Sequence, residues 1–390
     1  MLIAERAERA TQWARQVTSR PSTFLFVPSH ENQGLNYFQP EFAQELAQLK
    51  VGSFSCRLEH DSQPVDLLIC TDHCSDLSPQ LWSAHQQLGP QCMLATWFWD
   101  NHLAQMSNLR TALASDFVFA SHAYAAAGLL NPVAPYGAHV AACSAQWTRE
   151  QAMRGFEAAA NRPRSDRLLV NYVAYPSASR TPLLLALQAA NAPELDVLLM
   201  QPHDRSRYFS LSPSERFAEW AQHKAALILP IDKDLSTRLF DALLCGQVPV
   251  LLRDSVADLN QVITPADQRS LGFVQIDAAD VPSIRAGALL AARLWDEQGL
   301  AGARRRHEFV LGSHMLTSRL ETILKCLWAL GTGEAAVAHV PSAGALALQP
   351  AAALGRGPAP CPQSALKTPR LIARVIAWVR VLEPSLRKMA

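Results

Sequence analysis

Residues 225–252, AALILPIDKDLSTRLFDALLCGQVPVLL, limit the possible folds of this chain more than any other stretch. The apolar runs at its two ends have the length of buried β-strands. Between them, Ser236 is a suitable cap for a helix over 237–245, and Gly246 stands where helices commonly end. A strand–helix–strand unit this short requires parallel strands joined by a crossover. The polar loop 230–236 then lies at the carboxyl edge of a sheet, where ligands of α/β proteins bind and a helix N-terminus attracts phosphate.

The same alternation of strand and helix patterns runs through most of the chain and restarts once. The first series has four predicted strands, at 22–28, 65–73, 91–100 and 115–122. A charged, proline-containing stretch follows at 161–167, and strand and helix patterns then alternate again to about residue 298. Two such series predict an α/β protein with two Rossmann-like domains that face one cleft.

We predict four segments along the 390 residues. Residues 1–160 and 161–331 are the two Rossmann-like domains, and a long helix from about residue 300 ends the second and crosses back to the first. Residues 332–365, rich in Ala, Gly and Pro, are a flexible linker. Residues 366–390 resemble a basic amphipathic helix.

Composition excludes several classes of function. Lys plus Arg number 35 and Asp plus Glu 34, so the charge balance gives no sign of nucleic-acid binding. The eight cysteines include no Cys-x-x-Cys pair and no zinc-site spacing, which indicates reduced thiols in a cytoplasmic protein and no metal site. No signal peptide begins the chain, and no apolar run reaches the roughly 20 residues of a membrane span. Neither a G-x-G-x-x-G nor a Walker A loop is present, so NAD and ATP are not expected cofactors.

The stretch 227–252 resembles the donor-binding signature of GT-B glycosyltransferases. That signature is a strand, a polar loop, Ser-x-Arg-x-Phe-(Glu/Asp)-Ala-Leu and then Gly-x-(Val/Ile)-Pro-Val. The matching residues are Ser236, Arg238, Phe240, Asp241, Ala242, Leu243, Gly246, Val248, Pro249 and Val250. Residues 312–324 resemble the returning helix of the same enzymes. The resemblance covers residues 20–330 and implies an acceptor domain, residues 1–160, and a nucleotide-sugar donor domain, residues 161–331.

The resemblance implies where the donor phosphates bind. Arg238 offers a guanidinium, and Ser236, Thr237 and Lys233 surround the same helix N-terminus. Asp241 stands where many members have a glutamate that holds the ribose. The alternative for this group is a surface arginine beside an ordinary helix cap.

Two further loops of the second domain are candidates for donor binding. In MQPHDRSRYF, His203 and Arg205 follow a strand, and His203 is suited to phosphate binding or to protonating the leaving group. In YPSASR, Ser177, Ser179 and Arg180 open a helix and are candidate phosphate ligands. The alternative for His203 is a loop histidine that caps a turn.

Asp232 and Asp234 spell the Asp-x-Asp of metal-dependent transferases, but the motif lies in the second Rossmann-like half, directly before the GT-B signature. We therefore predict a metal-independent site. Asp232 instead stands where a nucleophile would form a covalent glycosyl adduct, as in retaining 3-deoxy-octulosonate (Kdo) transferases that use CMP-Kdo. Its alternative is a solvated loop carboxylate.

The acceptor side is predicted from loops of the first domain. Glu31 is the candidate catalytic base, with His30 beside it in PSHENQG. The stretch WFWDNH offers Trp97 and Trp99 for stacking on a sugar face, next to Asp100 and His102. The alternative for this second group is a pair of core tryptophans and a capping aspartate.

We therefore predict a glycosyltransferase that acts on a glycan or lipid-linked glycan acceptor in bacterial surface polysaccharide synthesis. Kdo from CMP-Kdo is the first donor hypothesis, and a UDP- or GDP-sugar is the alternative. A non-catalytic glycan-binding module is the alternative from another class. The basic helix 366–390 predicts peripheral contact with the inner face of the cytoplasmic membrane, or packing against protein.

Overall fold

The computed structural model describes residues 3–27, 40–57, 64–72, 85–86, 88–99, 105–122, 136–144, 146–176, 178–202, 210–333 and 349–350. All of them belong to one compact unit, residues 1–355, which contains two separate β-sheets. None of the helices described in these ranges is long and apolar enough to span a bilayer.

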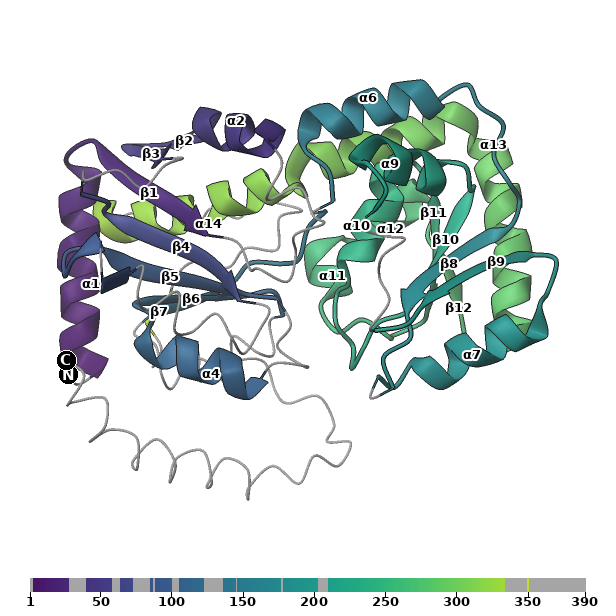
Figure 1. The fold of residues 1–390 in the computed structure, drawn as a ribbon, viewed down its shortest axis with the longest axis horizontal. Helices are drawn as coiled ribbons and strands as arrows, with labels where there is room; N and C mark the ends of the chain where they lie inside the picture. The colour runs from purple at the N-terminus through teal and green to yellow at the C-terminus, as the bar shows by residue number, and fades with distance from the viewer. Residues whose placement is uncertain are drawn as a thin grey trace, which may run out of the picture. The chain divides into compact units, whose positions relative to one another are not determined.

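The first sheet has the strand order β13-β7-β6-β5-β4-β1-β3-β2 (Figure 1). Its strands are β1 (Ser22–Val27), β2 (Lys50–Val51), β3 (Phe54–Arg57), β4 (Leu67–Asp72), β5 (Met93–Phe98), β6 (Phe117–Ala120), β7 (Tyr136–His139) and β13 (Gln349–Pro350). All neighbouring pairs are parallel except β2 with β3 and β13 with β7. The helices of this half are α1 (Ile3–Thr18), α2 (Pro40–Gln48) and α4 (Gln105–Ala114).

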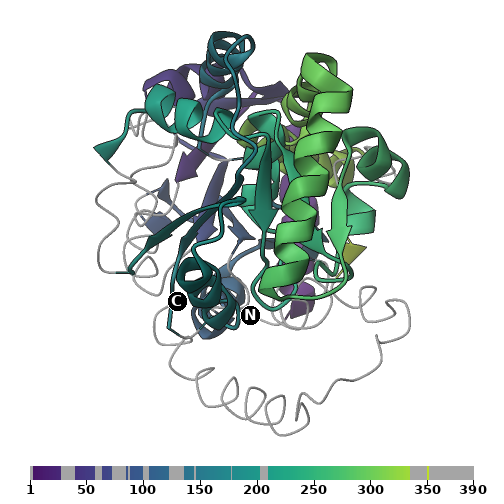
Figure 2. The same cartoon turned by 90° about the vertical axis from the view of Figure 1, so that its right-hand side faces the viewer.

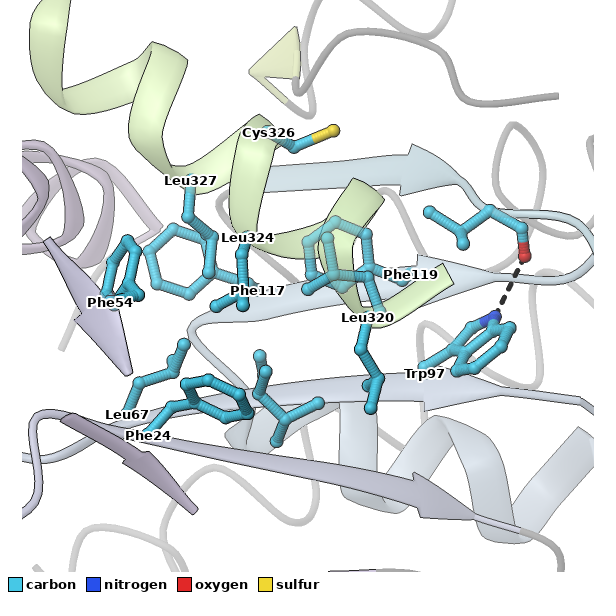
Figure 3. Close-up of a cluster of buried hydrophobic side chains, with 14 of the residues drawn as sticks. Phe24, Phe54, Leu67, Trp97, Phe117, Phe119, Leu320, Leu324, Cys326 and Leu327 are labelled. Atoms are coloured by element: carbon cyan, nitrogen blue, oxygen red, sulfur yellow. Dashed lines mark hydrogen bonds between the residues drawn. The ribbon is translucent and has the colours of Figure 1, made fainter. Parts of the chain in front are cut away.

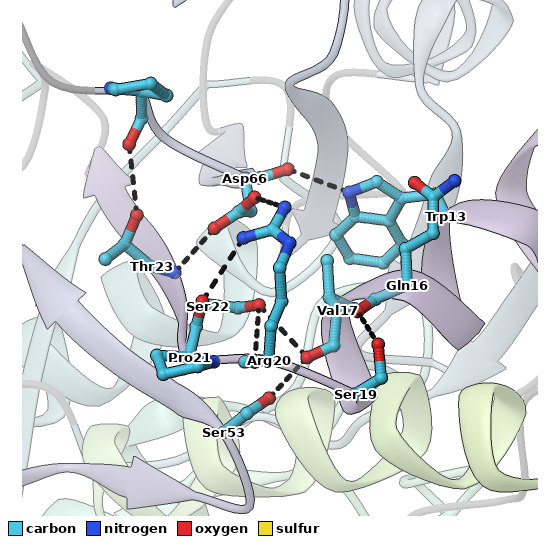
Figure 4. Close-up of polar contacts among 11 residues, drawn as sticks. Trp13, Gln16, Val17, Ser19, Arg20, Pro21, Ser22, Thr23, Ser53 and Asp66 are labelled. Carbon is cyan, nitrogen blue, oxygen red and sulfur yellow. Dashed lines mark hydrogen bonds and ion pairs between the residues drawn. The ribbon is translucent and has the colours of Figure 1, made fainter.

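The turn from α1 into β1 is fixed by Asp66, which precedes β4 (Figure 4). Its carboxylate accepts from the backbone N–H of Thr23 at 2.8 Å and pairs with Arg20 at 2.5 Å. Its carbonyl accepts from the indole N–H of Trp13 at 3.2 Å. The start of β1 is thereby tied to the start of its neighbour β4.

Apolar side chains on one face of the first sheet form a core with α1, α2 and α14 (Leu316–Thr332). Phe24, Leu67 and Phe117 point from three strands toward Leu320 and Leu324 of α14 (Figure 3). Helix α14 also packs along α1. Helix α14, which follows the second half in sequence, therefore returns to the first half.

The second sheet has the order β12-β11-β10-β8-β9 and is parallel throughout. Its strands are β8 (Leu168–Val173), β9 (Leu195–Met200), β10 (Ala225–Ile228), β11 (Val248–Leu252) and β12 (Val274–Ile276). Its helices are α6 (Arg149–Ala159), α7 (Thr181–Ala190), α9 (Pro213–Ala221), α10 (Thr237–Leu244), α11 (Leu259–Val262), α12 (Pro265–Leu271) and α13 (Val281–Ser313).

Successive side chains of these strands enter two different cores, as period-2 alternation requires. Leu169, Ala226 and Leu251 pack with α6, α9 and α10 on one face. Their neighbours along each strand pack with α7 and the first part of α13 on the other face. Figure 2 shows this half of the molecule facing the viewer. The sheet is thus covered on both sides, which is the doubly wound arrangement.

The predicted pair of Rossmann-like halves is confirmed, and so is the helix that crosses back. The predicted long helix from about residue 300 is not continuous. Helix α13 has non-helical backbone angles at Gly299, φ 56° and ψ −154°, and it ends at Ser313, before α14 begins at Leu316.

Two findings refine the predicted segments. Helix α6 precedes the predicted boundary at 160/161, yet Phe156 and Ala152 pack in the core of the second half. Within the predicted linker 332–365, residues 349–350 pair with β7.

Candidate functional site

The candidate site lies at the point in the second sheet where successive strands change from one side of β8 to the other. From β8 the chain adds β9 on one side, and it then crosses back to place β10 on the other side of β8. The loops after β8 and β10 consequently leave in opposite directions. A crevice opens at such a switch point, at the carboxyl ends of the strands.

Tyr172, near the carboxyl end of β8, is the central residue of this point and is fully buried. Its hydroxyl donates to the carbonyl oxygen of Leu227 at 2.8 Å and accepts from the backbone N–H of Leu229 at 2.7 Å. Leu229 is the first residue beyond β10. The tyrosine therefore holds the start of the loop that leads to α10. Burial raises the pKa of Tyr172, so it stays a neutral phenol.

Two arginines lie against the ring of Tyr172. The guanidinium carbon of Arg180, at the start of α7, is 4.5 Å from the ring centroid, and that of Arg238, in the first turn of α10, is 4.6 Å from it. Arg180 donates from Nη1 to the carbonyl of Leu229 at 2.9 Å, while its Nε is buried without a hydrogen-bond partner among the described residues. Burial lowers the pKa of Arg180, and Arg238 is one of the positive charges that lower it further.

Neither arginine has an ion-pair partner in the part of the chain that the structure describes, and no side-chain hydrogen bond of Arg238 is found there. Asp234 attracts Arg180 and Asp241 attracts Arg238 electrostatically, but neither acid is in direct ion-pair contact with its arginine. Two partly buried cations without a direct ion pair are costly, because each has lost part of its hydration. An anion bound between them would offset that cost.

The loop between β10 and α10 supplies the other predicted donor ligands. Ser236 caps α10 by accepting from the N–H of Arg238 at 3.3 Å. Asp232 and Lys233 are exposed and both have left-handed backbone angles, with φ of 50° and 68°. Such angles are uncommon outside glycine, although aspartate adopts them more often than most residues, and they concentrate at functional loops. The predicted helix-ending glycine, Gly246, has φ 76°, as a left-handed C-terminal residue requires.

Of the remaining predicted donor residues in this region, Thr237 begins α10 and is half-buried. Ser179 is exposed and directly precedes Arg180. The structure thus brings Arg238, Ser236 and Arg180 to one edge of the sheet, although Arg180 lies far from the other two in sequence.

Asp241 does not face this edge, and its predicted contact with a ribose finds no support in the structure. Its side chain is buried, and its two carboxylate oxygens accept from Ser144 Oγ at 2.7 Å and Gln146 Nε2 at 2.6 Å. Burial raises the pKa of Asp241 to about 6, against the opposing effect of the two donors. The residue fastens α10 to the segment that connects the two halves, since its partners belong to residues 141–147.

The predicted acceptor tryptophans also have interior positions. Trp97 is fully buried in the core under α14, and its indole N–H donates to the carbonyl of Val140 at 2.8 Å (Figure 3). Trp99 is 5% exposed and stands edge-on to Trp97, with ring centroids 4.9 Å apart. A sugar needs an open ring face for stacking, and neither tryptophan has one. The prediction that they bind the acceptor is therefore wrong, and they are core residues.

Seven predicted site residues lie outside the described residues: His30, Glu31, Asp100, His102, Ser177, His203 and Arg205. Their roles stay predictions. Among the residues that are described, no group of three or more His, Cys, Asp or Glu side chains is placed to hold a metal ion.

A small cavity lies on the Trp220 side of Arg238. It has a volume of about 60 Å³ and is lined by Asn171, Met200 and Trp220, among others. The guanidinium of Arg238 lies 6.0 Å from the ring centroid of Trp220, so this residue joins the cavity wall to the arginine pair. The volume is far below the roughly 300 Å³ at which small-molecule pockets begin, so the cavity has room only for a few waters or one small group.

Tyr172 was not among the residues predicted from sequence. The run LLVNYVAYP gives a strand by its apolar content, and a tyrosine in a buried strand indicates a core residue. One signal was available. A buried phenol usually has a hydrogen-bond partner, so a tyrosine in a buried strand indicates a polar group close by.

Comparisons with known proteins give weak similarities. No protein-family model and no curated protein matches the chain. Sucrose-phosphate synthase from Thermosynechococcus elongatus is similar over 68% of this chain and 74% of its own, with TM-score 0.43 and 12% identity. α,α-Trehalose 6-phosphate synthase from Burkholderia multivorans is similar over 75% of this chain and 74% of its own, with TM-score 0.42 and 12% identity. An α1,3-fucosyltransferase is similar over 79% of this chain and 96% of its own, with TM-score 0.38 and 10% identity. Similarities this weak do not by themselves identify a function.

Proposed function

We propose that this chain is a glycosyltransferase that takes a sugar from a nucleotide-sugar donor, and that Arg180 and Arg238 bind the donor phosphates. The observation that carries the proposal is a pair of guanidinium groups, neither in an ion pair with a described residue, at the switch point of a doubly wound sheet. The signature residues Ser236 and Arg238 supply the chemical context, since they stand at the N-terminus of α10.

The reaction needs stabilisation of a phosphate that gains charge as the sugar departs. Guanidinium groups supply it by charge-assisted hydrogen bonds, which can be bidentate on phosphate. The N-terminus of α10 adds backbone N–H donors and the positive end of the helix dipole. Preorganised donors of this kind contribute about 3–4 kcal/mol each to transition-state stabilisation in well-studied enzymes. We propose that this protein uses them in place of a metal ion.

Two cations favour a diphosphate over a monophosphate. The linkage in a UDP- or GDP-sugar carries two negatively charged phosphates, whereas CMP-Kdo carries one. A single phosphate would leave one of the two guanidinium groups without a counter-charge. We therefore place the nucleoside diphosphate sugar first and retain CMP-Kdo as the second donor hypothesis.

Asp232 is the residue that keeps the Kdo hypothesis open. It is exposed in the loop between β10 and the cap of α10, a few residues before Arg238. In that hypothesis Asp232 attacks the anomeric carbon while the phosphate leaves, and an acceptor hydroxyl then displaces Asp232 with net retention. The acceptor base would be Glu31, and the acceptor a glycan of the bacterial cell surface.

The test is binding and turnover in matched variants. Calorimetric titration with UDP, GDP and CMP should show measurable binding, tightest for a diphosphate. Arg238→Ala and Arg180→Ala should each weaken binding of the preferred nucleotide by about tenfold or more. Arg304→Ala is the control, because Arg304 is an exposed arginine that pairs with Glu157 at 2.8 Å on the outside of the second half.

The outcomes separate the alternatives. Binding by the unaltered protein and loss in the two site variants support the proposal. Binding of a nucleotide without sugar transfer to any glycan acceptor would favour the non-catalytic module. Absence of nucleotide binding, or equal binding by all three variants, would refute the phosphate site.

A further inference from the structure

Tyr172 has an arrangement that a core residue does not need. Two positively charged groups contact its ring, at 4.5 Å and 4.6 Å from the centroid. The two guanidinium carbons can be no farther apart than the sum of these distances. Like charges that close repel each other, and more strongly where protein excludes water. The π-face of an aromatic ring is negative, so the ring attracts both cations and offsets part of this repulsion.

The ring itself is held in place from the opposite end. The hydroxyl donates to Leu227 and accepts from Leu229, at the junction of β10 with its following loop. Leu229 also accepts from Arg180 through its carbonyl. Tyr172 therefore connects the end of β8, the loop before α10 and the two arginines, which come from α7 and α10.

We propose that Tyr172 is a positioning residue of the donor site, whose ring holds Arg180 and Arg238 in place to bind one diphosphate. This inference rests on the proposed function above. It goes beyond that function, because it assigns donor affinity to a residue that does not contact the donor. A purely structural tyrosine would be replaceable by any side chain that keeps the protein folded.

The test separates the effect of the ring electrons of Tyr172 from the effect of its hydroxyl, while the bulk of the side chain stays nearly constant. Tyr172→Phe keeps the ring and removes both hydroxyl hydrogen bonds. Incorporation of 4-fluoro-, 3,5-difluoro- and 3,4,5-trifluorophenylalanine at position 172 then withdraws electrons from the ring at nearly constant size. The probes are inorganic pyrophosphate and UDP, measured by titration calorimetry on the full chain, with uridine as a probe that lacks phosphate.

We expect affinity for pyrophosphate and UDP to fall with each added fluorine, by about tenfold from phenylalanine to the trifluoro variant, since two cation–π contacts weaken together. Affinity for uridine should not follow the series. Tyr136→Phe is the matched control. Tyr136 is a buried tyrosine of β7 whose hydroxyl also has a hydrogen bond, to Thr11 at 2.6 Å, and none of Arg180, Arg238 and Ser236 contacts it.

The outcomes for Tyr172 and for the proposed function are distinguishable. If the unaltered protein binds neither pyrophosphate nor UDP, the phosphate site itself is wrong. If it binds both and the fluorinated series binds them equally, the phosphate site stands and the role of the Tyr172 ring is overturned. A fall in affinity that uridine shares would also overturn it, because loss of the phosphate contacts alone cannot affect uridine.

Discussion

Asp241→Asn should change the pH dependence of stability, because Asp241 is a buried carboxylate with a raised pKa. The ionised form has lost its hydration, and among the described residues Ser144 and Gln146 are its hydrogen-bond donors. Its pKa is about 6 in the folded protein, against roughly 3.9 for an aspartate in an unfolded chain. The folded state therefore binds this proton more tightly than the unfolded state.

The sign and size of the effect follow from proton linkage. Because the folded-state pKa is the higher of the two, Asp241 makes the protein more stable as the pH falls through the window from about 6 to about 4. Between pH 7 and pH 5, a pKa of about 6 gives a gain of about 1 kcal/mol in the free energy of unfolding. Asp241→Asn does not titrate and lacks this gain.

The assay is urea unfolding of the wild type and of Asp241→Asn at pH 7, 6 and 5. The quantity to follow is the difference between the two free energies of unfolding, since other titrating groups are common to both proteins. It should move by about 1 kcal/mol in favour of the wild type toward pH 5. Ser144→Ala should move the pH-dependent stability change to higher pH. It removes one donor to the Asp241 carboxylate and so raises the pKa of Asp241 further. A difference that stays constant with pH, or moves the other way, would refute this account of Asp241.

Three further predictions follow from the site and the fold. Transfer activity should persist in EDTA, and its loss with recovery on adding manganese would restore a metal role for Asp232 and Asp234. If Asp232 is the nucleophile, enzyme incubated with donor alone should gain the mass of one sugar on the peptide that contains it, and Asp232→Asn should not; an inverted product would instead contradict the adduct. A chain ending at Gly355 should remain folded and bind nucleotide with unchanged affinity, because residues 1–355 form one compact unit, and insoluble product would count against this division.

Local patterns were sufficient to predict the doubly wound halves. The run from Ala225 to Leu252 contains its own strand, cap, helix, terminating glycine and second strand, and the structure has each of them at the expected place. These signals depend on interactions within a few residues, such as the Ser236 cap. The loop before α10 could therefore be placed at the carboxyl end of a strand without any knowledge of its neighbours, while its role in ligand binding stays a prediction.

The side chains that complete the site depended on tertiary structure. Sequence gives no means to predict that Tyr172 meets both Arg180 and Arg238, because their contact depends on β8 and β10 being adjacent. The same holds for Asp241, whose partners approach from the segment between the halves, and for Trp97, which α14 covers from the far end of the chain. A residue type fixes what a side chain can bind, whereas packing between distant segments decides whether it faces solvent, a ligand or the core. For this reason sequence alone determined the sheet edge and the chemistry available there, and only the fold decided which residues share it.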